Sequence, residues 1–183
     1  MKDLNFTELF CEIFSGLYTL LIITLIFDCF GYLDIIKTIQ GIMTLPIFTI
    51  TIVCSYLIGL IVDAIGLSLG EWFFDEWVSN EDDTPTKEEY AKYYKSVSET
   101  SAKYRDLQWS YYSLYRNIFL LSVVGIFFYM YKSGIVFGGG FAVLTTIIII
   151  GINACIFYAM RTLLNLYYKI TKGVAAESNT PTQ

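Results

Sequence analysis

Apolar residues along this 183-residue chain gather in long stretches that polar segments separate. Residues 38–62 and 133–160 contain no charged side chain, which makes uncharged runs of 25 and 28 residues. A helix rises about 1.5 Å per residue and needs about 20 apolar residues to cross the hydrocarbon core of a bilayer. Both runs exceed this length, so the pattern predicts an integral membrane protein rather than a soluble protein with buried helices.

Two shorter uncharged runs, residues 13–27 and 117–131, complete the set of predicted spans. The first reaches full length by including Asp28, and the second by including Tyr111 and Tyr115, whose rings suit the membrane interface. Acidic residues precede the first run and no small-residue cleavage pattern follows it, so we expect a retained helix. The sequence therefore predicts an all-α, polytopic fold with four transmembrane helices, near residues 12–33, 42–64, 112–131 and 136–159.

These spans divide the chain into four parts. We expect a first transmembrane helix pair in residues 1–70 and a second pair in residues 111–160. Residues 71–110 should form a cytoplasmic interfacial segment, in which Trp72 and Trp77 lie at the membrane surface, followed by a tyrosine-striped helix. Residues 161–183 are predicted to form an amphipathic cytoplasmic tail with a disordered end.

The basic residues predict the orientation of the chain. With a cytoplasmic N-terminus, the outer side holds only Lys37 and Lys132. The inner side then holds Lys2, Lys87, Lys92, Lys95, Lys103, Arg105, Arg116, Arg161, Lys169 and Lys172. Because cytoplasmic loops carry an excess of Lys and Arg, both termini and the middle loop are expected in the cytoplasm of a bacterial-type inner membrane.

Composition argues against several functional classes. The chain has no histidine, and its four cysteines have no paired spacing, so neither a metal site nor a disulfide framework is predicted. No nucleophile, zinc-protease or phosphate-loop motif is present, so we expect neither an enzyme nor a bound cofactor. The net charge of -5, without a basic cluster free of acids, argues against direct nucleic acid binding.

The loop between the second and third spans contains a helix start signal. Thr86 and Glu89 have the spacing of a capping box, and no proline or glycine follows before Gly125. The sequence therefore predicts one unbroken helix from about Thr86 into the third span. Residues spaced alternately by three and four mark one face of this helix: Tyr90, Tyr94, Val97, Ser101, Tyr104, Gln108, Tyr111 and Tyr115.

A tyrosine-rich face of this kind needs a partner. Tyrosine combines apolar area with a hydroxyl group that tolerates water, which suits a partly hydrated interface. The partner is either residues 64–78 and 161–170 of the same chain, the same face in neighbouring subunits, or a cytosolic protein. The sequence leaves these three alternatives open.

Small residues mark two faces within the membrane. Residues on one face are Ser55, Gly59, Asp63, Gly66 and Gly70, and those on the other are Gly151, Cys155 and Ala159. Small side chains at this spacing let helix backbones approach closely, either within a subunit or between subunits of a homo-oligomer. Asn153, an amide deep in a span, is expected to form a hydrogen bond between helices rather than to bind a permeating ion.

Four charged residues are expected at the cytoplasmic boundary, each on a different span: Glu12, Asp63, Arg116 and Arg161. Charge at membrane depth usually faces the bundle interior, so these residues are candidates for one network. The alternative is that each side chain extends separately to the lipid headgroups. Asp63 fits that alternative least, because its side chain is short and lies on the glycine face.

Over the whole chain, the four spans, cytoplasmic termini and helical cytoplasmic loop resemble the layout of four-span membrane subunits of bacterial antiviral systems, such as the membrane subunit of Kiwa. The resemblance implies an oligomeric effector, sensor or channel subunit. One alternative is a membrane anchor that recruits a cytosolic protein through its cytoplasmic helices. The other is a small transporter, which Pro46 and Asn153 weakly favour.

Overall fold

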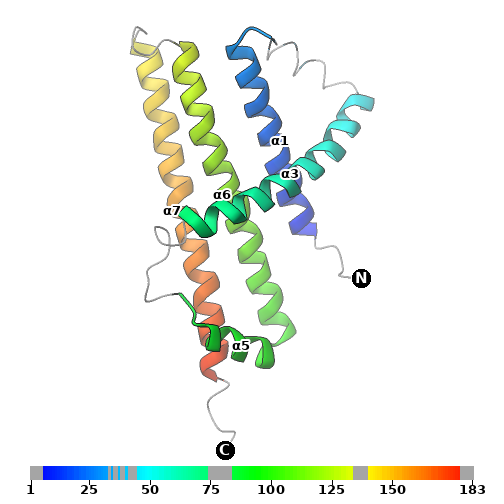
Figure 1. The fold of residues 1–183 in the computed structure, drawn as a ribbon, viewed down its shortest axis with the longest axis vertical. Helices are drawn as coiled ribbons and strands as arrows, with labels where there is room; N and C mark the ends of the chain where they lie inside the picture. Colours follow the sequence, from blue (N-terminus) through cyan, green and yellow to red (C-terminus); the bar gives the residue numbers. More distant parts are fainter. Residues whose placement is uncertain are drawn as a thin grey trace, which may run out of the picture.

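The computed structural model describes residues 6–32, 34, 37, 40, 45–73, 84–133 and 140–177. The helices are α1 (Phe6–Cys29), α3 (Leu45–Phe73), α5 (Lys87–Ser96), α6 (Glu99–Ser133) and α7 (Gly140–Glu177) (Figure 1). All of these except α5 are long and apolar enough to cross a membrane. The protein is thus an all-helical membrane protein with four spans, as predicted. Trp77 and the end of the predicted tail lie outside the described residues.

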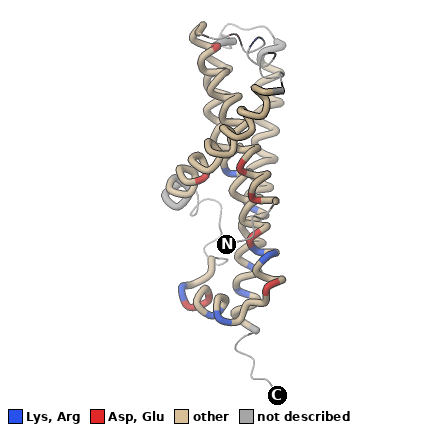
Figure 2. Tube along the Cα trace, turned by 90° about the vertical axis from the view of Figure 1, so that its right-hand side faces the viewer, with Lys and Arg blue, Asp and Glu red and all other residues tan. Residues whose placement is uncertain are grey.

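The spanning helices form a bundle from which two helices project. Helix α6 packs against α1 on one side and α7 on the other, while α3 crosses α1 and α6 obliquely (Figure 1). Beyond the N-terminal end of α1, α6 and α7 continue side by side as a stalk, and α5 packs across α7 near its end. Figure 2 shows that most charged residues gather on the stalk and at its junction with the bundle. We call these two parts the bundle and the stalk.

Helix α5 begins at the predicted capping box. The Thr86 amide donates to Oε2 of Glu89 at 2.7 Å, and the Glu89 amide donates to the Thr86 hydroxyl at 3.3 Å. The first of these bonds lowers the pKa of the Glu89 carboxyl group, because it favours the charged form. The predicted helix start is therefore confirmed.

The predicted continuous helix from Thr86 into the third span is wrong. Helix α5 ends at Ser96, Val97 is extended, and α6 begins at Glu99. The hydroxyl oxygen of Ser98 accepts from the amide of Ser101 at 3.2 Å, which caps the new helix. Because serine can bond the backbone in a non-helical conformation, a break here needs neither proline nor glycine.

An aromatic core holds the two helices of the stalk together. Its buried residues are Tyr112 of α6 and Met160, Leu164 and Tyr168 of α7. The rings of Trp109 and Tyr167 add a contact with 5.1 Å between centroids. Helix α7 runs 38 residues without interruption, so the fourth span and the described part of the predicted tail form one continuous helix.

Candidate functional site at the helix junction

Helices α1 and α3 meet through backbone contact. A Cβ atom added to Gly16 would collide with the carbonyl group of Ser55, and one added to Gly59 would collide with the carbonyl group of Glu12. Only glycine allows helices to approach this closely. The Ser55–Gly59 part of the predicted small-residue face therefore has its partner within the same chain.

Helix α1 carries a complementary face that was not predicted from the sequence. Cys11, Ser15 and Thr19 are all buried and lie four residues apart, and Gly16 adds the point of closest approach. These are small residues with the spacing already recognised on α3. The signal was therefore present in the sequence, although it lacked a pair of glycines.

Asp63 and Arg116 form an ion pair where α3 crosses α6. Arg116 Nη2 lies 2.7 Å from Asp63 Oδ1 and also donates to the Asp63 carbonyl oxygen at 3.3 Å. The hydroxyl of Ser113 donates to the same carboxylate, and Asn117 Nδ2 lies 3.4 Å from it. The structure thus brings together two of the four predicted boundary charges.

This ion pair matters for stability because Arg116 is buried. Arg116 is only 1% exposed, so its side chain does not extend to the headgroups as the alternative interpretation required. Removing one member of a buried pair leaves the other charge without compensation, which is strongly destabilising. Gly66 contributes space, because an added Cβ would lie 3.0 Å from Arg116 Nε and 2.5 Å from Asn117 Oδ1.

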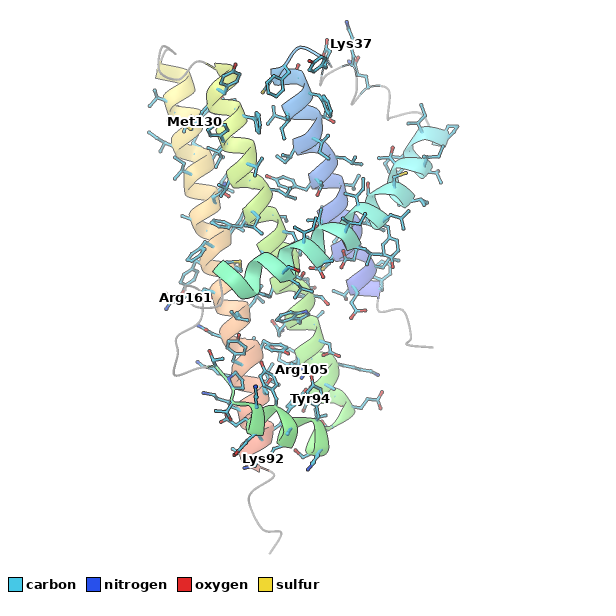
Figure 3. All side chains as sticks on the ribbon, viewed as in Figure 1. Lys37, Lys92, Tyr94, Arg105, Met130 and Arg161 are labelled. Carbon is cyan, nitrogen blue, oxygen red and sulfur yellow. The ribbon has the colours of Figure 1, made fainter. Side chains whose placement is uncertain are left out.

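Glu12 lies beside this pair without joining it. It lines a polar cavity of about 260 Å³ between α1, α3 and α6, together with Glu8, Asp63 and Ser113. Its Oε2 atom is buried and has no hydrogen-bond partner among the described residues. Arg161 is exposed on α7, a helix that does not line this cavity (Figure 3). The structure thus pairs Asp63 with Arg116, places Glu12 beside them on the same cavity, and leaves Arg161 on a helix away from that cavity.

A row of polar side chains continues from the junction into the bundle. Asn117 Nδ2 donates to the Ser15 hydroxyl at 3.2 Å, and deeper in the bundle the hydroxyls of Tyr18 and Ser122 lie 2.6 Å apart. These residues alternate between α1 and α6, and they were not predicted from the sequence. Only the contact between the two helices shows that they belong together.

The second predicted small-residue face remains open in the chain. A Cβ added to Gly151 meets no atom within 4 Å, and Cys155 is exposed. Asn153, on the same helix, does not form the predicted bond between helices. Its Nδ2 instead donates to the carbonyl oxygen of Ile149 one turn earlier, at 2.9 Å.

The predicted tyrosine face is divided by the break at Val97. Tyr94, Tyr104 and Tyr111 are exposed, whereas Tyr90 and Val97 are partly buried. The buried tyrosines of α5 and α6 are instead Tyr93 and Tyr112. Part of the aromatic surface thus packs within the chain, against α7, and part of it remains available.

Arg105 holds α5 onto the stalk. Its guanidinium group lies 4.4 Å from the ring centroid of Tyr93, 5.2 Å from that of Tyr94 and 5.3 Å from that of Tyr167, so it contacts α5 and α7 at once (Figure 3). Burial raises the pKa of Tyr93, because the anion would lose its hydration. Asp106 completes the arrangement by accepting from Arg105 at 3.0 Å.

Comparisons of the chain with protein-family models, with curated proteins and with solved structures found no match. The resemblance in layout to antiviral membrane subunits is therefore still a prediction.

Proposed function

We propose that this chain is a membrane-spanning docking and signalling subunit, whose stalk lies in the cytoplasm of a bacterial-type cell and binds a protein partner. The observation that carries the proposal is the continuity of α6 and α7, which run unbroken from the bundle into the stalk. A tilt or rotation of the stalk would therefore reach the spanning helices directly.

The exposed tyrosines support the docking role. Tyr104 and Tyr111 are separated by seven residues on one face of α6, and both are exposed. Tyrosine is enriched in protein interfaces because it joins apolar area to a polar group. The open Gly151–Cys155 face of α7 supports assembly of several copies, in which each subunit presents its own stalk.

The Asp63–Arg116 pair supports the signalling role. It fixes α3 to α6 at the level where the stalk leaves the bundle, so partner binding that shifts α6 changes the contact with α3. By its layout, such a subunit suits a bacterial antiviral system in which a cytosolic component is recruited to the membrane. The preference of Lys and Arg for the stalk side supports the cytoplasmic orientation.

Site-specific photo-crosslinking in living cells tests the docking role. A benzophenone amino acid at Tyr104 or Tyr111 should give a discrete adduct with a second protein. The same group at Lys169, an exposed stalk position on α7, serves as the control and should give much less. An adduct with the mass of two copies of this chain would assign the face to self-assembly. Absence of any adduct, with normal expression, would contradict a docking role.

Thiol labelling tests the orientation. After replacement of the four native cysteines by alanine, Lys92→Cys should be protected from an impermeant reagent in intact cells and Lys37→Cys should react. Both lysines are exposed, at opposite ends of the molecule (Figure 3). Reaction at position 92 in intact cells would contradict the cytoplasmic stalk.

The buried polar row favours a second candidate function, conduction of protons or small ions. Ser15, Tyr18, Asn117 and Ser122 reach from the polar cavity into the bundle and form hydrogen bonds between α1 and α6. Polar groups in a row at membrane depth are also typical of proton and ion paths. Purified protein in liposomes should then dissipate a proton gradient, and Asn117→Leu should slow this flux. Proton flux equal to that of empty liposomes would rule out conduction and leave docking as the proposed function.

A further inference from the structure

A second cavity lies within the bundle, away from the junction and the stalk. It measures about 380 Å³ and lies between α1, α6 and α7. Its wall is mostly isoleucine and leucine and contains no charged residue. The polar residues that line it are Tyr18, Ser122, Tyr129 and Asn153.

Asn153 supplies an acceptor that the chain leaves unused. The residue is only 7% exposed, and its Nδ2 is occupied by the carbonyl oxygen of Ile149. Its Oδ1 is buried without a hydrogen-bond partner among the described residues. Water cannot satisfy polar groups within the hydrocarbon region as it does at a surface, so an unpaired amide oxygen at this depth calls for a partner.

The Tyr18–Ser122 pair supplies hydroxyl groups to the same cavity. Their oxygens lie 2.6 Å apart, and either residue can be the donor. The two residues carry two hydroxyl hydrogens, and one of them forms this bond. The other hydrogen can be donated to a further acceptor. The cavity therefore offers both a donor and an acceptor in an otherwise apolar wall.

We propose that this cavity binds an uncharged, membrane-dissolved molecule that carries a hydroxyl group on an apolar body. The ligand hydroxyl would donate to Asn153 Oδ1 and accept from the Tyr18–Ser122 pair, while its body packs against Ile22, Ile149 and neighbouring residues. The absence of charge in the lining disfavours a charged ligand. The volume falls within the range of small-molecule sites, about 300–1,000 Å³. This site does not depend on the proposed docking function.

Photolabelling of the full chain in lipid nanodiscs tests the proposal. The probe is octanol carrying a diazirine, and the matched control is the same diazirine alkane without the hydroxyl group. The alcohol should label the helix segments around Ser122 and Asn153 saturably, with competition by unlabelled octanol. The alkane should label them weakly and without saturation. Equal labelling by both probes would overturn the proposal, since it would show an apolar crevice only.

Variants separate the hydrogen bonds from general packing. Asn153→Leu and Ser122→Ala should each weaken alcohol labelling about tenfold, the effect of one lost hydrogen bond. Ile148→Leu, on the same helix but lining a different groove, should leave it unchanged. Without ligand, Asn153→Leu should keep or raise thermal stability, because it removes an unpaired carbonyl. Unchanged labelling in folded Asn153→Leu protein would overturn the proposal.

Two further measurements identify the source of the hydroxyl group. Native mass spectrometry of protein purified with its membrane should reveal a bound lipid alcohol if the ligand is a lipid. Delipidated protein that binds only added octanol would assign the site to a free alcohol. If a reactive group at position 153 crosslinks two copies of the chain, the occupant is a neighbouring subunit and the proposal is wrong.

Discussion

The small-residue faces of α3 and α7 share one sequence pattern and differ in structure. On α3, Ser55 and Gly59 meet the backbone of α1 so closely that no Cβ fits. On α7, Gly151 has open space around it, and Cys155, four residues on, is exposed. A spacing of four thus indicates the capacity for close approach but does not identify what approaches.

The difference lies in the neighbouring helix. Helix α1 presents its own small residues, Cys11, Ser15 and Gly16, so two narrow surfaces meet. Helix α7 packs on α6 through large rings, such as Phe157 against Phe119 at 5.5 Å, and leaves its small residues on another side. A small-residue face predicts a close helix contact only when the neighbouring helix carries a complementary small-residue face.

Leucine at the two glycines tests this comparison most strongly. Gly59→Leu should destabilise the bundle by about 3 kcal/mol or more, because the side chain would have to displace the backbone of α1. Gly151→Leu should change the stability of the single chain by less than about 0.5 kcal/mol, as at other open sites. Reversible unfolding in mixed detergent micelles measures both values.

The same two substitutions distinguish packing within one chain from assembly of several chains. If Gly151 faces another copy, Gly151→Leu should lower the mass of the detergent complex without loosening the bundle. Equal destabilisation of the monomer by both substitutions would contradict the difference between the two faces.

Within the stalk, adjacent tyrosines provide a second comparison. Tyr112 is 1% exposed in the aromatic core, whereas Tyr111 is 37% exposed. Tyr112→Ala should therefore cost about 3 kcal/mol of stability, as expected for loss of a buried ring. Tyr111→Ala should cost less than about 1 kcal/mol while weakening crosslinking to the partner. Similar stability losses in the same unfolding assay would show that Tyr111 belongs to the core.

The sequence predicted the features that depend on local pattern or chain composition. Uncharged runs predicted the four spans, and the Thr86–Glu89 spacing predicted the start of α5. The spacing of the small residues along α3 also placed Asp63 on the glycine face, where it contacts Arg116. Each of these signals lies within one segment of the chain.

Features that depend on contact between segments were missed or assigned incorrectly. The helix break at Val97 depends on the cap formed by one serine, Ser98. Serine is also common inside uninterrupted helices, so its presence alone does not predict a break. The row through Ser15, Asn117 and Ser122 became recognisable only when α1 and α6 lay together. Arg161 was grouped with Asp63 by depth, but depth does not determine which way a helix face points.

The cap of α5 should give the smallest effect. Thr86→Ala should cost about 1 kcal/mol, the usual effect of losing a capping side chain. The Glu89 carboxylate is stabilised as the anion, so its contribution is complete above its ordinary pKa of 4.5 and is lost as pH falls through its lowered folded value. Hydrogen exchange of α5 amides at neutral and acidic pH should show both effects. Protection that is unchanged by the substitution would contradict a role for the capping box in holding α5.

A double-mutant cycle on Asp63 and Arg116 tests most directly whether the junction couples the bundle to the stalk. Asp63→Asn and Arg116→Gln should each destabilise the protein, and the double substitution should cost less than their sum, with a coupling of about 0.5–3 kcal/mol. Partner crosslinking at Tyr104 should fall in each single variant and recover in part in the double variant. Strict additivity in both unfolding and crosslinking would contradict the account, because it would make the two charges independent anchors.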